Sequence, residues 1–366
     1  MTRIAKIWPF LTGPSKYHDH HLSIVMNEDS IETVFFAPNY TDPLFKASGL
    51  NENSVDCFTG FELFKYVLFF GKTIPLNPFR VAKKIIEKSD IIHFFGFAQP
   101  SALLLLIMIR LTGYTKKIYF NEHTDLSVLT KKQTIYHKTL ILLYSIIGGN
   151  ITLICCDENT KKYWKSIGLN SEIVIIPLGY NDKEFFVTNK IRDWGELRIG
   201  FAGRVDIRKN IELLLDKARE FPDIEFYICG FNDSEYSRSL LNRISAIGRE
   251  ANIYTHPFAN SLEVLRTFYN EIDVAIYPGS ITIGTYEANA CGSFVVVNRW
   301  DEDYSNRVDN LRGLSFENPD ELSNLISILR LMKNTGNLDP CRISEFTKNY
   351  SWQHLKYEYY NLYKVK

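Results

Sequence analysis

The chain has 366 residues, of which 42 are Lys or Arg, 42 are Asp or Glu, and 14% are aromatic. This length suits two domains with separate cores, and the aromatic content excludes a disordered chain. The balanced charge argues against a nucleic-acid-binding protein that depends on a broad basic surface, so we expect no nucleic-acid partner.

Short runs of β-branched and aromatic residues alternate with longer stretches of helical spacing. The apolar runs are continuous, as in strands buried on both faces, and the helices between them indicate parallel βαβ units. The strands predicted first along the chain are 4–9, 31–37, 91–95, 117–121, 151–155 and 174–177. Those predicted after them are 197–202, 224–229, 253–255, 274–277 and 293–297. The sequence therefore predicts an α/β fold with parallel sheets.

The pattern of strands and helices restarts once along the chain. Residues 182–196 are polar with weak periodicity, and a new strand begins directly after them. We therefore expect an N-terminal domain over 1–185 and a C-terminal domain over 195–349. Residues 350–366 have helical spacing and many tyrosines, and a helix this aromatic needs a surface that buries it. We expect it to pack back on the N-terminal domain.

The first candidate site lies where the strand 197–202 ends. Gly203 follows the strand, a polar loop comes next, and the apolar face of a helix begins at Ile211. Glycine allows a close turn, and a ligand at such a turn meets the N-terminus of the next helix. Arg204 and Lys209 bracket the loop and would neutralise a diphosphate as it leaves. On spacing alone, two solvated cations explain the pattern equally well.

The second candidate site follows the strand 274–277. A loop rich in Gly, Ser and Thr leads into a short helix that carries Glu287. A carboxylate one turn into this helix can accept hydrogen bonds from the paired hydroxyls of a ribose. The backbone N–H groups of Gly284 and Thr285 would face phosphate at the positive end of the helix. Taken alone, Glu287 is better explained as an acid that interacts favourably with the helix dipole.

Together the two stretches resemble the C-terminal domain of GT-B glycosyltransferases, most closely family 4. The glycine–arginine pair and the lysine five positions later are matched by Gly203, Arg204 and Lys209, and an acid–alanine helix ending in Cys-Gly begins at Glu287. The resemblance implies two Rossmann-like domains facing a cleft, with the C-terminal helix crossing back to the first. It also implies an acceptor in the first domain, a nucleoside-diphosphate sugar in the second, transfer with retention, and no metal or other cofactor.

The resemblance further assigns roles to individual residues. The implied donor-binding residues are Gly13, Gly203, Arg204, Lys209, Thr282, Gly284, Thr285 and Glu287. The implied catalytic residues are His123, Arg204, Lys209 and Asp19. His123 follows a predicted strand and would contact the transferred sugar, whereas a lone histidine is more often a structural hydrogen-bonding group.

The stretch 17–21 holds three histidines and Asp19. Its spacing does not match a zinc site, so we expect no metal there. His18 or Asp19 as the base for the acceptor hydroxyl is one hypothesis, and solvated residues at a helix start are the other.

One position departs from the family pattern. The family usually has two acids eight positions apart, the first near the transferred sugar, whereas here Gly279 stands eight positions before Glu287. The loop between them is also about three residues short, and Thr282 is its nearest polar residue. Either the donor sugar is held through backbone groups of the loop, or part of the chemistry has been lost.

Residues 58–70 are unusually rich in Phe, Leu and Tyr, with Lys65 and Lys72 beside them. The pattern predicts a helix that either approaches a lipid-linked acceptor at a membrane surface or lies buried between domains. No apolar run reaches the roughly 18 to 20 residues of a membrane span, and we see no secretion signal. We therefore expect a cytoplasmic protein, with membrane association on the inner face if the helix is interfacial.

The sequence thus predicts a glycosyltransferase that moves a sugar from a nucleoside diphosphate to a hydroxyl of a glycan or lipid-linked acceptor. The pathway implied is the synthesis of a bacterial surface polysaccharide or glycoconjugate. Two alternatives stay open. A sugar-nucleotide epimerase of the same architecture would consume donor without an acceptor, and a catalytically silent partner of another transferase would explain Gly279.

Overall fold

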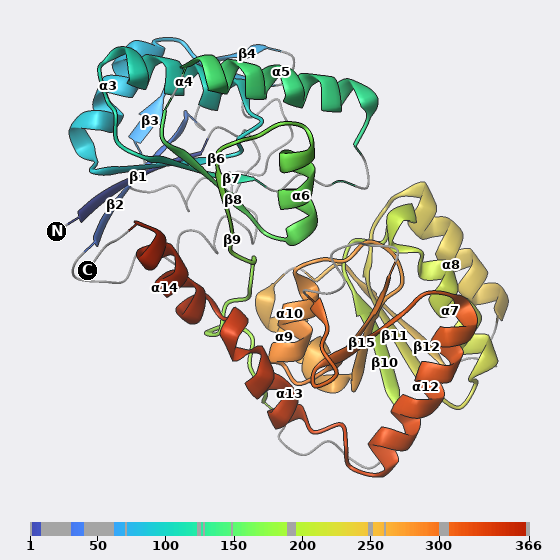
Figure 1. Cartoon of the computed structure of the whole chain (residues 1–366). Helices are drawn as coiled ribbons and strands as arrows, with labels where there is room; N and C mark the ends of the chain where they lie inside the picture. The colour runs from blue at the N-terminus through green and yellow to red at the C-terminus, as the bar shows by residue number, and fades with distance from the viewer. Residues whose placement is uncertain are drawn as a thin grey trace. The chain divides into compact units, whose positions relative to one another are not determined.

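The computed structural model (Figure 1) divides the chain into two compact units, Met1–Leu178 with Leu355–Lys366, and Gly179–His354. Each unit contains a parallel sheet with helices packed on it, which confirms the predicted α/β fold with two Rossmann-like domains. The residues that the structure describes are 2–8, 31–39, 62–69, 72–122, 126, 129–147, 149–188, 195–247, 252–259, 261–299 and 307–363.

The sheet of the first unit has the strand order β3-β2-β1-β6-β7-β8-β9. Its strands are β1 (Thr2–Ile7), β2 (Ile31–Pro38), β3 (Glu62–Phe64), β6 (Ile91–Phe95), β7 (Ile118–Glu122), β8 (Ile151–Cys155) and β9 (Glu172–Ile175). All neighbouring strands are parallel. The order reverses between β1 and β6, so the chain leaves these two central strands in opposite directions.

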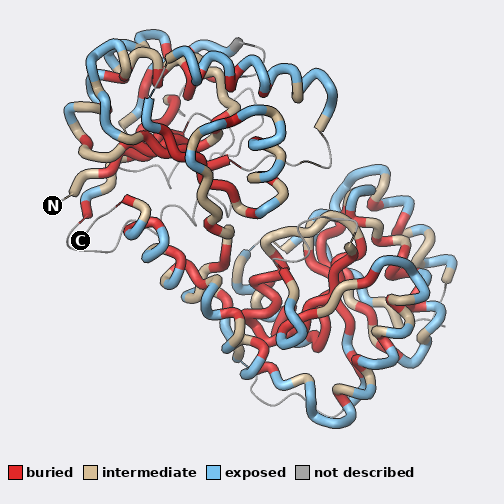
Figure 2. The backbone as a smooth tube through the Cα atoms, viewed as in Figure 1, coloured by how far each residue is buried: buried red, intermediate tan, exposed pale blue. Residues whose placement is uncertain are grey.

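One face of this sheet is apolar and is covered by helices. The helices are α3 (Pro78–Lys88), α4 (Pro100–Leu111), α5 (Lys131–Ile147) and α6 (Glu158–Ser166). Alternate strand residues such as Ile92, Phe94 and Phe120 point into this core together with Leu106 and Trp164. Figure 2 shows how burial concentrates in the strands while the outward sides of the helices stay exposed.

The opposite face of the same sheet is more polar and carries the C-terminal helix α14 (Trp352–Tyr363). His93 contacts the Asn121 side chain through Nε2 at 2.8 Å and the Tyr363 hydroxyl through Nδ1. The Tyr119 hydroxyl donates to the carbonyl oxygen of Leu362 at 3.0 Å. The aromatic residues of the terminal helix are thus buried by hydrogen-bonding side chains as well as by apolar ones.

The prediction of a helix over 58–70 is wrong for those of its residues that the structure describes. Residues 62–64 form β3, and β4 (Tyr66–Phe69) pairs antiparallel with β5 (Lys72–Pro75). Burial alternates along the segment, with Phe64 and Tyr66 buried and Leu63 and Val67 exposed. A period of two belongs to a strand, and aromatic and β-branched residues favour it. Residues 58–61 and 70 lie outside the described residues.

The sheet of the second unit has the order β12-β11-β10-β13-β14-β15, all parallel. Its strands are β10 (Arg198–Ala202), β11 (Glu225–Phe231), β12 (Ile253–Pro257), β13 (Val274–Tyr277), β14 (Phe294–Asn298) and β15 (Gly313–Phe316). Its helical segments are η4 (Ile207–Lys209), α7 (Ile211–Glu220), α8 (Glu235–Ile247), α9 (Leu262–Glu271), α10 (Gly284–Ala290), α12 (Pro319–Asn334), α13 (Pro340–Thr347) and η6 (Lys348–Tyr350).

Every predicted strand is confirmed to within two residues at each end, whereas β3, β4, β5 and β15 were not predicted. The first unit ends earlier than the expected residue 185. Tyr180 and Phe185 are buried in the core of the second unit. The Tyr180 N–H donates to the carbonyl of Tyr350, and the Trp352 N–H donates to the carbonyl of Tyr180.

Candidate active site

The strands of the two sequence stretches singled out above, β10 and β13, end at the same edge of the second sheet. β10 and β13 are hydrogen-bonded neighbours, with Ile199 opposite Val274. From β10 the chain continues to β11 on one side, and from β13 it continues to β14 on the other. Ligands of open parallel sheets bind outside the carboxyl ends of strands where the order reverses in this way. The loops after β10 and β13 therefore form the candidate site.

The loop after β10 begins with a close approach between two strands. Gly203 follows β10, and its N–H donates to the carbonyl of Cys229 at 3.1 Å. Gly230 has a φ of +134°, and a Cβ there would collide with the carbonyl oxygen of Gly203. The Asp206 carboxylate then accepts the Arg208 N–H at 3.0 Å, which caps the turn η4. The loop is consequently fixed by its own backbone.

Arg204 is one of two exposed arginines in this loop. Among the residues that the structure describes, none makes a hydrogen bond or ion pair with its guanidinium. Arg208, the neighbouring exposed arginine, is instead paired with Asp206 at 3.1 Å. The Arg204 guanidinium is therefore available to an external anion at the carboxyl end of β10.

Lys209 has a different environment. Its side chain is buried, with 7% exposure, and Nζ donates to both the carbonyl oxygen and the hydroxyl of Ser280 at 2.7 Å. The Ser280 N–H in turn donates to the carbonyl of Arg208 at 2.8 Å. Lys209 thus joins the loop after β10 to the loop after β13, and its charge lies at their junction.

Gly279 lies against the backbone of the first loop. A Cβ at this position would collide with the carbonyl oxygen of Arg208 and would lie 2.7 Å from the Cα of Lys209. The Asn298 side-chain amide, at the end of β14, donates to the carbonyls of Pro278 at 2.5 Å and Gly279 at 2.9 Å. With the loop held from both sides, no side chain fits where the family pattern has its first acid.

The turn into α10 is satisfied internally. The Gly284 N–H donates to the Thr282 hydroxyl at 3.2 Å, and the Thr285 N–H donates to the Thr282 carbonyl at 3.2 Å. The Thr285 hydroxyl donates to the same carbonyl at 3.0 Å. The expectation that these two N–H groups face phosphate is not supported by this arrangement, because Thr282 already accepts both.

Glu287 is almost fully buried within α10. The hydroxyls of Tyr269 and Tyr277 lie 3.1 Å apart, and a Cβ on Gly284 would come within 2.8 Å of both. Burial raises the pKa of Tyr269 well above its ordinary range, and the neighbouring Tyr277 hydroxyl and Glu287 carboxylate raise it further. The tyrosines therefore stay neutral beside Glu287. Sequence reasoning missed this pair, because the two hydroxyls come from different elements.

The candidate residues of the first unit can be placed only in part. Gly13, His18, Asp19 and His123 lie outside the described residues. Glu122, directly before His123, is buried at the end of β7 and accepts the Ala98 N–H at 3.1 Å. Among the described residues no cluster of His, Cys, Asp and Glu is arranged to hold a metal ion.

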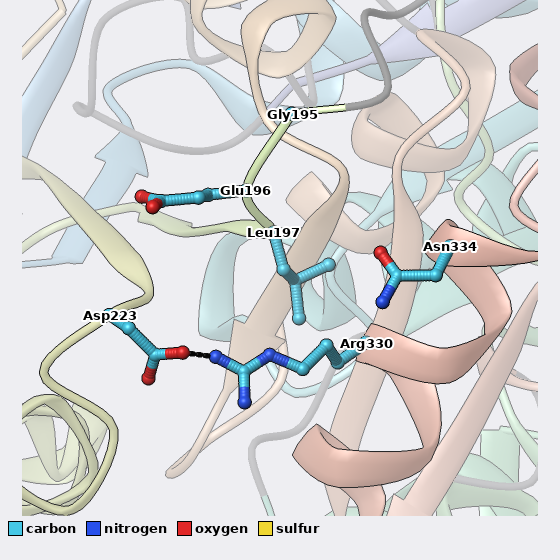
Figure 3. Close-up of a pocket in the computed structure, with 6 residues that line it drawn as sticks. All are labelled: Gly195, Glu196, Leu197, Asp223, Arg330 and Asn334. Carbon is cyan, nitrogen blue, oxygen red and sulfur yellow. Dashed lines mark ion pairs between the residues drawn. The ribbon is translucent and has the colours of Figure 1, made fainter.

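A hollow of about 470 Å³ in the second unit lies away from these residues. It is lined by Gly195, Glu196, Leu197, Asp223, Arg330 and Asn334 (Figure 3). Arg330 forms an ion pair with Asp223, so the main cation of the hollow is already neutralised. The hollow lies at the amino end of β10, the opposite end from Arg204 and Lys209.

Residues 182–341 match the family model of glycosyl transferases group 1. No curated protein sequence compared with the chain matches it. Among solved structures, HepE from Anabaena in complex with UDP aligns at 13% identity and a TM-score of 0.77 over 100% of both chains, and HepE has also been solved with UDP-glucose.

Two further solved structures have the same fold. Sucrose-phosphate synthase from Thermosynechococcus elongatus aligns at 15% identity and a TM-score of 0.70, over 100% of this chain and 98% of that one. The lipopolysaccharide outer core galactosyltransferase WaaB aligns at 12% identity and a TM-score of 0.72, over 98% of both. Identities this low speak for the fold alone. Together with the match over residues 182–341, they show that the chain has the two-domain fold of GT-B glycosyltransferases and that its second unit carries a glycosyl transferases group 1 domain.

Proposed function

We propose that the chain transfers a sugar from a nucleoside diphosphate to an acceptor hydroxyl. The observation that carries the proposal is the exposed guanidinium of Arg204, without a partner in the described part of the chain, at the carboxyl end of β10. A guanidinium binds phosphate oxygens through two parallel hydrogen bonds, and at a strand end it meets the leaving diphosphate. The UDP and UDP-glucose complexes of HepE support a nucleotide sugar as the donor.

In this proposal the three charged residues have separate tasks. Arg204 binds the diphosphate and stabilises the negative charge that develops as it leaves. Lys209 holds Ser280, and with it the loop after β13, in the position the donor needs. Glu287, in the first turn of α10, accepts hydrogen bonds from the ribose hydroxyls. The proposal assigns no task to a metal, because the Arg204 guanidinium offsets part of the charge of the diphosphate.

The close packing at Gly279 supports the first of the two interpretations of the missing acid. The loop after β13 has a defined conformation, since Asn298, Lys209 and the Arg208 carbonyl all form hydrogen bonds with it. The donor sugar would then be held by backbone groups of this loop. We also propose that the chain belongs to family 4 and transfers the sugar with retention at the anomeric carbon. Both proposals rest on the resemblance of its sequence motifs to that family.

The acceptor we propose is a glycan or a lipid-linked glycan, in the synthesis of a bacterial surface polysaccharide. The structural likeness to the lipopolysaccharide galactosyltransferase WaaB supports this class of acceptor. A cytoplasmic site of synthesis, with the protein at the inner face of the membrane, is consistent with such an acceptor.

The test is a thermal-shift panel of UDP, GDP, ADP and CMP sugars on the wild type and on two matched arginine variants. One diphosphate sugar should raise the melting temperature. Arg204→Ala should weaken its binding by roughly tenfold to a hundredfold, the effect of losing hydrogen bonds to a charged group. Arg208→Ala, in the same loop, should bind it as the wild type does. Equal binding by both variants, or no binding of any sugar nucleotide, would contradict the proposal.

A turnover assay separates transfer from epimerisation. The donor used is the sugar nucleotide that raises the melting temperature. A transferase should release nucleotide from it slowly when it is the only substrate, and much faster when an acceptor glycan is added. An epimerase would convert the donor fully without any acceptor.

A further inference from the structure

The helix α5 has apolar side chains on two opposite sides. Leu140, Ile141 and Tyr144 are buried against the rest of the first unit. On the other side Ile135, Leu142 and Ile146 are 65%, 59% and 72% exposed. These three are seven and four positions apart, so at 3.6 residues per turn they form one stripe. A surface helix of a soluble protein ordinarily presents polar residues there.

The charges beside this stripe are all positive. Lys131, Lys132 and Lys138 are exposed, and the helix contains no Asp or Glu. Counted around the helix, the three lysines flank the apolar stripe on both sides. Apolar residues bordered by lysines are the composition of helices that lie in a lipid interface.

A second exposed apolar segment belongs to the same layer of the first unit. Val67 and Leu68 of β4 are partly exposed, and Lys65 and Lys72 beside them are exposed as well. Its partner strand β5 packs against α4, as α5 does. No helix in the described part of the chain is long and apolar enough to cross a membrane, so these segments are not spanning elements.

We propose that the outer face of α5 binds an anionic lipid surface. Ile135, Leu142 and Ile146 would enter the boundary between headgroups and acyl chains, and the lysines would contact lipid phosphates. A second copy of the chain fits less well, because two α5 helices face to face would bring lysines together with no acid from either helix. This inference goes beyond the proposed transfer reaction and does not depend on it.

The test is co-sedimentation of the full chain with vesicles of phosphatidylcholine alone or with about one third phosphatidylglycerol. The wild type should bind the anionic vesicles. The variant Ile135→Ser/Leu142→Ser/Ile146→Ser should lower the partition coefficient at least about tenfold, since most of the inserted apolar surface is lost. Replacing Lys131, Lys132 and Lys138 by Gln should lower it about fivefold per lysine and remove the preference for anionic lipid.

The matched control is Leu331→Ser, which removes a 63% exposed leucine from α12 of the second unit and should leave partition unchanged. All the substituted side chains are exposed, so the melting temperature should stay near that of the wild type. The lysine variant keeps every apolar side chain and tests the proposal even if the serine variant unfolds. Absence of the wild type from both vesicle pellets overturns the proposal. So does a dimer in sedimentation velocity that the serine variant dissociates, since the stripe would then join two copies.

Discussion

Gly279 is a position in the candidate site at which the backbone leaves no room for a side chain. The carbonyl of Arg208 and the Cα of Lys209 occupy the space that a Cβ would need. Neither atom can move without displacing the loop that also carries Arg204. An acid at this position is therefore excluded by packing, whatever its chemical use would be.

We predict that Gly279→Ala displaces the loop after β13 and destabilises the protein by about 1–3 kcal/mol, as other overpacking substitutions do. Donor kcat/KM should fall at least about tenfold, because Ser280 and Lys209 move with the loop. Urea unfolding and steady-state kinetics check both effects. Gly279→Glu should be no more active than Gly279→Ala.

Gly195→Ala is the matched control. In the described part of the chain a Cβ at Gly195 meets no heavy atom within 4 Å, so stability should change by less than about 0.5 kcal/mol. A Gly279→Ala variant as active as the control would mean that the loop is not fixed as the structure has it.

At the scale of elements, the two loops at the carboxyl ends of β10 and β13 act as one unit. Lys209 crosses from one to the other, and Asn298 adds a third attachment from β14. Lys209 could position the loop or act on the diphosphate directly through its charge. The two roles predict different effects of substituting Ser280, which carries no charge.

We predict that Lys209→Ala lowers kcat/KM strongly and stability by about 1–3 kcal/mol, since the partly buried Ser280 carbonyl loses a charged donor. Ser280→Ala removes only the hydroxyl and should lower kcat/KM in the same direction, by about fivefold, if Lys209 acts by holding the loop. Full activity of Ser280→Ala would show that the ammonium acts on the donor instead. Lys217→Ala is the control, because this buried lysine of α7 donates to Glu220 and Ser323 and should affect stability without changing the KM for donor.

The elements themselves could be predicted only where their pattern is local. All strands of the two parallel sheets except the edge strands β3 and β15 were predicted from continuous apolar runs, which depend on burial of each strand alone. The alternation of Phe64, Lys65 and Tyr66 is also local, but the surrounding aromatic residues concealed it and led to a helix. The N–H groups of Gly284 and Thr285 were expected to face phosphate, but Thr282 accepts both. A threonine two or three positions before those N–H groups is a signal that could have predicted the internal hydrogen bonds.

At the scale of the whole molecule, each unit has its own core, and the first also buries a lysine that has no acidic partner among the described residues. Lys6 of β1 is fully buried on the sheet face that carries α14, and its ammonium has no hydrogen-bond partner among the described residues. The rings of Phe95, Tyr359 and Tyr363 lie 5.1 to 5.8 Å from it. Burial lowers the pKa of Lys6 from 10.5 to about 7. The terminal helix thus packs over a lysine that is easily deprotonated.

The pKa of Lys6 predicts how stability depends on pH. Between pH 7 and about 10.5 the unfolded chain holds a proton that the folded chain has released, so the Lys6 contribution makes stability rise with pH in this range. Below pH 7 both states are protonated and the full cost of the buried charge is present. Lys6→Met should therefore stabilise the first unit most at and below pH 7, by a few kcal/mol, and less at pH 9.

Urea unfolding of the wild type and of Lys6→Met from pH 6 to 9 measures this difference. His93 beside Lys6 does not titrate in the range, because burial and the Lys6 charge hold its pKa well below the ordinary value. Lys162→Met, at an exposed position of α6, should follow the wild type at every pH. Destabilisation by Lys6→Met at pH 7 would show instead that the charge is held by favourable contacts.

The sequence by itself determined the fold class, the places of the main strands, and the two glycine-containing stretches that follow β10 and β13. These follow from the order of residues along the chain, because burial of a strand and a turn at its end are local properties. Only the tertiary structure decided that Gly279 meets the backbone of Arg208, that Lys209 binds Ser280, that Lys6 is buried under the C-terminal helix, and that the apolar outer face of α5 is exposed. Each of these depends on which distant segments become neighbours, and that is fixed by the strand order and by the packing of helices on the sheets.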